Sequence, residues 1–116
     1  MITVQDLEGS FQVSGRNQDE FASTYTGVLK LKIRPEGSIL AHWTIGESQV
    51  QVGTGFFKNN LLVINFSYGD QQEFKGTVVY KCLTADLLDG FWSEEAANPK
   101  YLGSEKAFRI QSELLN

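Results

Sequence analysis

The stretch Tyr25–Ile45, YTGVLKLKIRPEGSILAHWTI, contains the pattern that decides the fold. Between positions 25 and 33, alternate residues are apolar or glycine, and the residues between them include Lys30 and Lys32. A period of two is typical of a β-strand with one buried and one solvated face. The turn residues Arg34–Gly37 follow, with a proline that presets φ and a glycine. Alternation then resumes over Ile39–Ile45, so the stretch predicts an antiparallel hairpin.

Similar runs of β-branched and aromatic residues, separated by turn residues, continue along most of the chain. No window shows an apolar stripe at a helical period. The predicted strands are Ser10–Ser14, Tyr25–Ile33, Ile39–Ile45, Gln49–Phe57, Leu61–Tyr68, Phe74–Cys82, Leu87–Ser93 and Glu105–Ile110. About eight evenly spaced strands predict an all-β fold, an antiparallel up-and-down barrel, with a β-sandwich as the alternative. Glycines within strands, such as Gly27 and Gly55, favour the barrel because closing a sheet requires sharp bends.

Composition and size indicate one globular domain over residues 1–116. A hydrophobic fraction of 41% is too high for a disordered chain. The net charge of -4 argues against a nucleic-acid partner, because nucleic-acid modules carry a basic footprint. Cys82 is the only cysteine, which excludes an intramolecular disulfide and favours a reducing compartment. The sequence shows neither a signal peptide nor an apolar run of the ~18 residues a membrane span needs, so we expect a cytoplasmic protein.

Several short motifs, in this order, resemble a known group of proteins. The motifs are Gly9-x-Phe11-x-Val13-x-Gly15, Tyr25-x-Gly27-x-Leu29-x-Leu31, Trp43-Thr44-Ile45-Gly46, Gly53-x-Gly55, Asn60-x-Leu62-x-Ile64, Gly76-x-Val78-x-Tyr80, Leu88-x-Gly90-x-Trp92 and Gly103-x-Glu105. Together they resemble small, largely uncharacterised bacterial proteins with avidin- or lipocalin-like barrels of the calycin type. The resemblance implies a fold and carries no catalytic motif with it. One departure is Phe11, where lipocalins and avidins have an opening tryptophan.

Residues suited to catalysis or metal binding are few and far apart in the sequence. His42 is the only histidine, and it alternates away from Trp43, so we expect it on the outer surface. No Gly-x-Ser-x-Gly motif presents a nucleophilic serine. One histidine and one cysteine on different strands cannot complete the usual zinc ligand set, and Cys82 is expected in the core. We therefore expect no enzyme activity, no metal and no cofactor.

Carboxylates are the remaining candidates for chemistry. The possible acid–base pairs are Asp86 with Asp89 and Glu94 with Glu95. Adjacent residues of an extended chain point in different directions, so we expect Glu94 and Glu95 on a solvated loop. Glu105 and Arg109 share the inward face of the last strand at a period of two. They are predicted to form a structural ion pair at one end of the barrel.

The leading function hypothesis is a non-enzymatic binding module for a small apolar or aromatic ligand at a barrel mouth. The predicted ligand-binding residues are Trp43, Tyr80, Trp92, Leu29 and Leu31. Tryptophan and tyrosine combine a large apolar face with a polar tip that can orient a ligand. The loop Glu94–Gly103 is predicted to act as a lid. The alternative is a closed core, because eight strands leave an interior that side chains can fill; such a domain would act structurally or through its outer wall.

Two neighbouring predicted strands, Val50–Phe57 and Leu61–Tyr68, are apolar on both faces. A barrel wall exposed to water should alternate between apolar and polar residues. We therefore expect another surface to cover these strands, and a second subunit is the simplest cover, which predicts a homo-oligomer. The alternative cover is provided by the terminal segments Met1–Leu7 and Ser112–Leu115.

Overall fold

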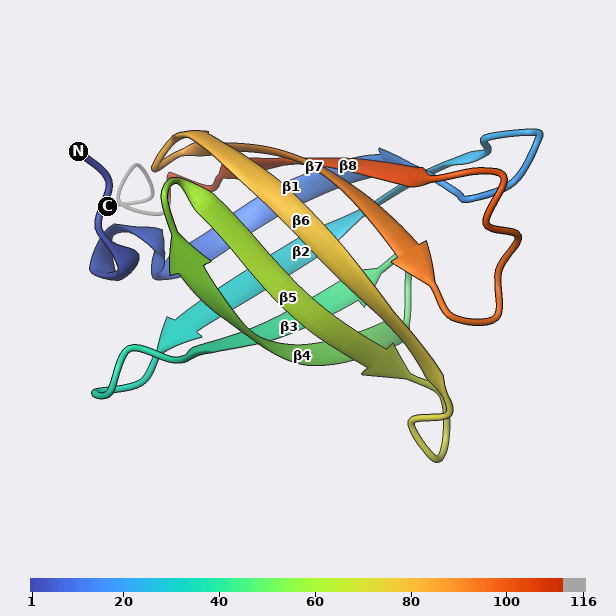
Figure 1. The fold of residues 1–116 in the computed structure, drawn as a ribbon, viewed down its shortest axis with the longest axis horizontal. Helices are drawn as coiled ribbons and strands as arrows, with labels where there is room; N and C mark the ends of the chain where they lie inside the picture. The colour runs from blue at the N-terminus through green and yellow to red at the C-terminus, as the bar shows by residue number, and fades with distance from the viewer. Residues whose placement is uncertain (112–116) are drawn as a thin grey trace.

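Eight antiparallel strands close into a barrel in the computed structural model, which describes residues 1–111 (Figure 1). The elements are η1 (Val4–Leu7), β1 (Gly9–Arg16), β2 (Thr24–Ile33), β3 (Ile39–Ile45), β4 (Gln49–Lys58), β5 (Leu61–Tyr68), β6 (Phe74–Thr84), β7 (Leu87–Glu94) and β8 (Gly103–Arg109). Each strand pairs with the next along the chain, and β1 pairs with β8. The prediction of an up-and-down barrel is confirmed, and the sandwich is excluded.

The short 3-10 helix η1 closes one end of the barrel and was not predicted. Its first turn is capped by the Asp6 carboxylate, which accepts a hydrogen bond from the Thr3 backbone N–H at 2.8 Å. Leu7, the last residue of η1, is fully buried at this end. A four-residue element has too few positions to show a hydrophobic period, so pattern analysis cannot detect it.

Arg109, at the end of β8, fastens η1 to the barrel. Its guanidinium donates hydrogen bonds to the backbone oxygens of Asp6 at 2.6 Å and Glu8 at 2.9 Å. It also forms an ion pair with Asp86 at 2.6 Å and lies over the Phe11 ring, 4.6 Å from its centroid. These contacts join the first and last strands to the chain preceding β1. The end of the barrel near η1 is therefore closed by a fixed structure.

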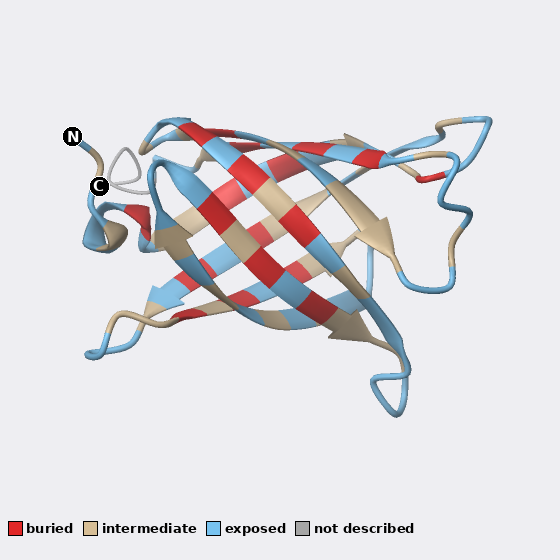
Figure 2. Ribbon diagram, viewed as in Figure 1, coloured by how far each residue is buried: buried red, intermediate tan, exposed pale blue. Residues whose placement is uncertain are grey.

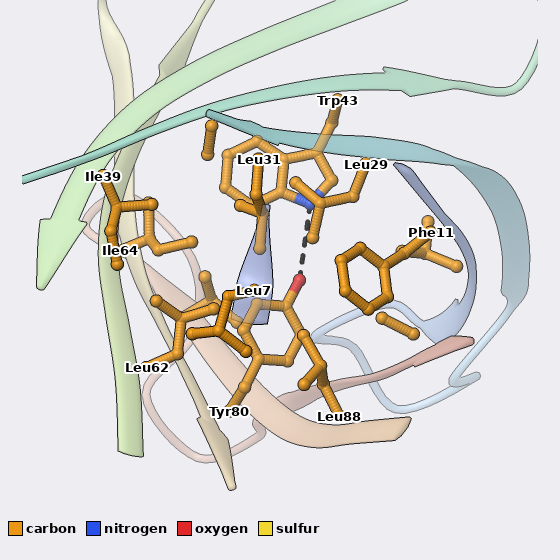
Figure 3. Close-up of a cluster of buried hydrophobic side chains, with 14 of the residues drawn as sticks. Leu7, Phe11, Leu29, Leu31, Ile39, Trp43, Leu62, Ile64, Tyr80 and Leu88 are labelled. Carbon is orange, nitrogen blue, oxygen red and sulfur yellow. Dashed lines mark hydrogen bonds between the residues drawn. The ribbon is translucent and has the colours of Figure 1, made fainter. Parts of the chain in front are cut away.

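The half of the interior next to η1 is a packed hydrophobic core. Buried or half-buried residues alternate with exposed ones along most strands (Figure 2), as expected for a barrel whose outer face is in contact with water. Figure 3 shows side chains from most strands meeting around the Tyr80 ring.

Cys82 is buried and His42 is exposed, as predicted. Within residues 1–111, no helix is long and apolar enough to cross a membrane.

Strands β4 and β5 carry apolar side chains on both faces, as the sequence indicated. Leu62, Ile64 and Phe66 are buried inside the barrel. The most exposed apolar residue on the outer face of these two strands is Phe56, of which 58% is accessible. Of the proposed terminal covers, the segment 1–7 instead packs at the end of the barrel, and Ser112–Leu115 lies outside the described residues.

Candidate functional site

A cavity of about 310 Å³ opens at the end of the barrel opposite η1. Its walls are formed by Asn17, Tyr25, Trp43, Ile45, Gln49, Gln51, Phe66, Tyr68, Val78, Tyr80, Trp92, Glu94 and Glu105. Six of these side chains are aromatic, two are carboxylates, and none of these lining side chains is basic. The volume lies at the lower end of the range for small-molecule sites, roughly 300–1,000 Å³.

The predicted site residues divide between this cavity and the core beneath it. Trp43, Tyr80 and Trp92 lie in the cavity wall. Leu29 and Leu31 also point into the barrel, but they belong to the packed half and do not line the cavity. An open lumen and a filled core, which the sequence presented as alternatives, thus occupy different halves of the same barrel.

Glu105, on β8, is the chemical centre of the cavity floor. Only 5% of the residue is exposed. Its carboxylate accepts hydrogen bonds from the Tyr25 hydroxyl at 2.7 Å, from the Trp43 indole N–H at 3.2 Å, and from the Tyr80 hydroxyl. Trp92 in turn donates its indole N–H to the Tyr25 hydroxyl oxygen at 2.9 Å. Every polar tip of these four aromatic residues is therefore used by one network.

The predicted ion pair between Glu105 and Arg109 is wrong. Both residues do point inward, but four residues of extended chain separate them by about 13 Å along the strand. Glu105 lies at the cavity floor, whereas Arg109 pairs with Asp86 at the closed end. Asp86 therefore belongs to the closure of the barrel, and Asp89 is exposed on the outer wall.

Two glycines let the tyrosines reach Glu105. In the strand register, Gly15 lies between Tyr25 and Glu105, and Gly90 lies between Glu105 and Tyr80. A Cβ atom on Gly90 would be 2.7 Å from Cδ1 of Tyr80, and one on Gly15 would collide with the Tyr25 ring. Each ring thus leans across a glycine toward the carboxylate, an arrangement that any side chain at these positions would block.

Burial and the hydrogen-bond network act in opposite directions on Glu105. Burial raises the pKa of this carboxyl above the ordinary glutamate value, because a charge is disfavoured away from water, while the three donors partly offset that rise. Burial, together with the neighbouring Glu105 charge, raises the pKa of both Tyr25 and Tyr80. The two hydroxyls therefore stay protonated as donors throughout the neutral range.

A second carboxylate, Glu94, lies at the rim of the cavity and is half-buried. This differs from the expected solvated loop, although its neighbour Glu95 is exposed as predicted. The Tyr68 hydroxyl donates to Glu94 at 2.6 Å, and burial followed by this contact raises the pKa of Tyr68. Sequence analysis placed Glu94 on the loop because the predicted strand ended at Ser93, one position before the observed end of β7.

The loop between β7 and β8 is fastened to its neighbour, which does not fit a free lid. Gln18, in the β1–β2 loop, is only 7% exposed. Its amide nitrogen donates to the backbone oxygens of Asn98 at 3.2 Å and Tyr101 at 2.8 Å, and its amide oxygen accepts from the Glu94 backbone N–H at 2.9 Å. No residue from 95–102 is among the described lining residues, so this loop frames the mouth without covering it.

The aromatic rings of the cavity wall support one another edge to face. The ring centroids of Trp43 and Phe66 are 6.1 Å apart, and those of Phe66 and Trp92 are 6.3 Å apart, with interplanar angles of 71° and 84°. Tyr25 and Trp92 form a third such pair at 6.4 Å. This is a favoured geometry for aromatic contacts. The aromatic part of the wall is therefore held in place by contacts between its own members.

The part of the chain that the structure describes contains no group of three His, Cys, Asp or Glu side chains arranged to hold a metal ion. The aromatic wall residues that sequence analysis missed are Tyr25, Phe66 and Tyr68, and it also missed the role of Glu105. A signal was present in the pattern, because Tyr25 and Phe66 alternate in phase with other inward residues of their strands. Whether such an inward residue lines the cavity or belongs to the packed core depends on its depth along the barrel. That depth is set by the register of all eight strands.

No protein-family model and no curated protein matches the sequence. Solved structures do match the fold. A redesigned β-barrel superimposes with a TM-score of 0.74 at 15% identity, covering 93% of this chain and 95% of that one. Another redesigned β-barrel, bound to DFHBI, gives 0.69 at 19% identity, with 90% and 100% covered. A protein of unknown function from the DUF3598 family of Nostoc punctiforme gives 0.59 at 13% identity; 95% of this chain matches 50% of it. At these identities the likeness shows the fold alone.

Proposed function

We propose that this protein is a non-enzymatic binding module that takes a small aromatic or apolar molecule into the mouth of its barrel. The observation that carries the proposal is the half-open cavity, with six aromatic side chains around a fixed polar floor. Small-molecule sites generally combine an apolar wall with a few well-placed polar groups. The proposal includes no catalytic step, because the Glu105 carboxylate is already engaged by three donors.

Structural neighbours give indirect support to the proposal. One redesigned barrel of the same fold is bound to DFHBI, and a designed barrel is described as fluorescence-activating. Both identities are below 20%, so the residues of those sites are not transferred to this chain. Kinship with avidin- or lipocalin-type barrels, suggested by the sequence motifs, is a further part of the proposal. The likeness to the DUF3598 protein is compatible with that kinship.

The proposal predicts that a neutral aromatic probe, phenethyl alcohol, binds in the cavity with a Kd of about 1 mM or tighter, a reasonable range for so small a ligand. Binding is measured by calorimetry and by the fluorescence of Trp43 and Trp92, which line the cavity. Val78→Phe adds a ring to the cavity wall and should abolish binding. No saturable binding of phenethyl alcohol to the unaltered protein would contradict the proposed function.

A matched control tests whether the added ring acts through the cavity. Val28 is half-buried and points outward from β2, opposite to its inward neighbour Leu29. Val28→Phe adds the same ring to the outer wall and should leave the Kd unchanged. Both variants need an unfolding transition close to that of the parent, since a folding defect would also remove binding. Equal loss of binding in the two folded variants would place the probe outside the cavity.

We also propose self-association through the outer wall as a second function, favoured by one specific observation. Phe56, Val63, Val79 and Phe91 are consecutive cross-strand partners on the outer faces of β4 to β7. Phe56 is 58% and Phe91 50% exposed, so the row forms a band of apolar side chains in contact with solvent. An apolar band of this kind is typical of a protein interface. We propose a second copy of the chain as its partner.

Charges beside this band favour a second copy as the partner. Lys81, Asp89 and Lys106 are cross-strand neighbours in the adjacent outer row. Alternating charges can pair with the same row of a two-fold related molecule. Sedimentation should show a concentration-dependent dimer that Phe91→Lys reduces to monomer, because the new charge would have to be buried. A monomer at every concentration of the unaltered protein would contradict this second proposal.

A further inference from the structure

We propose that the ligand of this cavity is an organic cation, an aromatic or apolar group that carries a protonated amine. This inference rests on the proposed binding function and specifies the chemical class of the ligand. Two carboxylates, Glu94 and Glu105, line the cavity, and the other lining side chains are neutral. The cavity wall therefore carries a net negative charge at any pH at which the two carboxylates are ionised.

Basic residues near the mouth do not offset this charge inside the cavity, since none of the residues that line it is basic. Arg16, the last residue of β1, and Lys75, near the start of β6, are both exposed. Each is the strand neighbour of an inward glycine, Gly15 or Gly76, so each points to the outer wall. Charges on the outer surface are screened by water and salt, whereas charges within an enclosed cavity are screened much less. An anionic ligand would therefore meet uncompensated repulsion.

The two carboxylates differ in their capacity to bind an amine. An ionised carboxylate offers about four acceptor positions. Glu105 already accepts from Tyr25, Trp43 and Tyr80. Among the described residues, Glu94 accepts a side-chain hydrogen bond only from Tyr68, through Oε1. The geometry therefore assigns the ammonium group to Glu94 at the rim, while Glu105 adds negative potential at the floor.

The remaining wall suits the body of such a ligand. Phe66 and Trp92 are packed edge to face beneath the rim and offer apolar surface to a ring. The faces of aromatic rings also attract cations, most strongly when the cation is shielded from water. A ligand that enters ring first can thus bury its apolar part and keep its ammonium group beside Glu94 and the Tyr68 ring.

Three probes of nearly equal size separate charge from shape: phenethylamine, phenethyl alcohol and hydrocinnamate. At neutral pH they are cationic, neutral and anionic. We expect the amine to bind at least about tenfold more tightly than the alcohol, the difference typical of a hydrogen bond to a charged group. Hydrocinnamate should bind more weakly than the alcohol. Calorimetry at low salt gives the three dissociation constants.

Two single substitutions test the role assigned to Glu94. Glu94→Gln keeps an amide oxygen for the Tyr68 hydroxyl but removes the charge, so it should remove most of the preference for the amine over the alcohol. Glu95→Gln removes the same charge from the adjacent exposed residue, which does not line the cavity. It should leave all three dissociation constants within about twofold, because exposed charges interact weakly.

The possible outcomes distinguish this inference from the proposed function. Equal affinities for amine and alcohol, or tightest binding of hydrocinnamate, would overturn the charge preference while leaving a binding cavity. An amine preference that persists in Glu94→Gln and disappears in Glu95→Gln would overturn the assignment to Glu94. Absence of saturable binding for all three probes would overturn both the inference and the proposed function.

Discussion

Glu105→Ala should lower the free energy of unfolding by about 2–4 kcal/mol, since it leaves buried donors without their acceptor. Tyr25, Trp43 and Tyr80 all donate to this carboxylate, and Tyr80 is fully buried. The expected loss is a large share of the 5–15 kcal/mol typical of a domain. Urea unfolding followed by circular dichroism measures it. A loss below about 0.5 kcal/mol would show that water from the cavity replaces the carboxylate.

Glu105→Gln is the matched control, because its amide oxygen still accepts hydrogen bonds while the buried charge is removed. It should cost about 1 kcal/mol or less near neutral pH. Comparison of the parent with Glu105→Gln also reports on the pKa of Glu105. A raised pKa in the folded state means that the folded protein holds the proton to higher pH than the unfolded chain. The stabilisation from this proton is complete below the ordinary value of 4.5 and is lost as pH rises through the folded-state pKa.

The free energy of unfolding of the parent should therefore fall relative to that of Glu105→Gln as pH rises from 4.5. Unfolding curves at several pH values give this difference directly, and other titrating groups cancel because both proteins share them. Tyr25 and Tyr80 face Glu105, but their pKa values are raised further above neutrality and do not interfere. A relative gain by the parent over this range would mean that the three donors outweigh burial.

The fold could be predicted because its determinants are local. Alternation over Tyr25–Ile33 and the turn at Arg34–Gly37 depend only on neighbouring residues, and both are found in the structure. The predicted bounds of β3 and β5 agree with those observed. Most of the strand ends that differ, such as Glu94 on β7, are places where pairing with a neighbouring strand extends the strand beyond its own apolar pattern.

The candidate site could be predicted only in part because its determinants are distant in the sequence. Alternation correctly placed Glu105 inward, but it could not give the partner. Tyr25 is 80 residues away and Trp43 is 62 residues away, and only barrel closure brings them to the carboxylate. The choice of Arg109 as partner followed from a shared strand face, which contains no information on position along the barrel axis. Chain patterns thus predict which face a residue occupies, whereas the strand register decides which residues meet.

Gly103→Ala should destabilise the protein by about 1–3 kcal/mol, the usual cost of overfilling a packed interior. Gly103 is buried at the start of β8 and is the cross-strand partner of Trp92. A Cβ atom at this position would overlap the six-membered part of the Trp92 indole. The ring would have to move away from β8 and toward the cavity, and its hydrogen bond to the Tyr25 hydroxyl would lengthen or break.

The same substitution should weaken binding of phenethyl alcohol, although residue 103 itself does not line the cavity. A double-mutant cycle with Trp92→Ala tests the cause. If the added methyl group acts by displacing the indole, Gly103→Ala should cost about 0.5 kcal/mol or less once the indole is absent, because the two changes share one contact. Equal costs in both backgrounds would show that the backbone of β8, and not the Trp92 ring, requires glycine here. A displaced ring also predicts an altered tryptophan emission spectrum in Gly103→Ala, which an effect on the backbone alone would not produce.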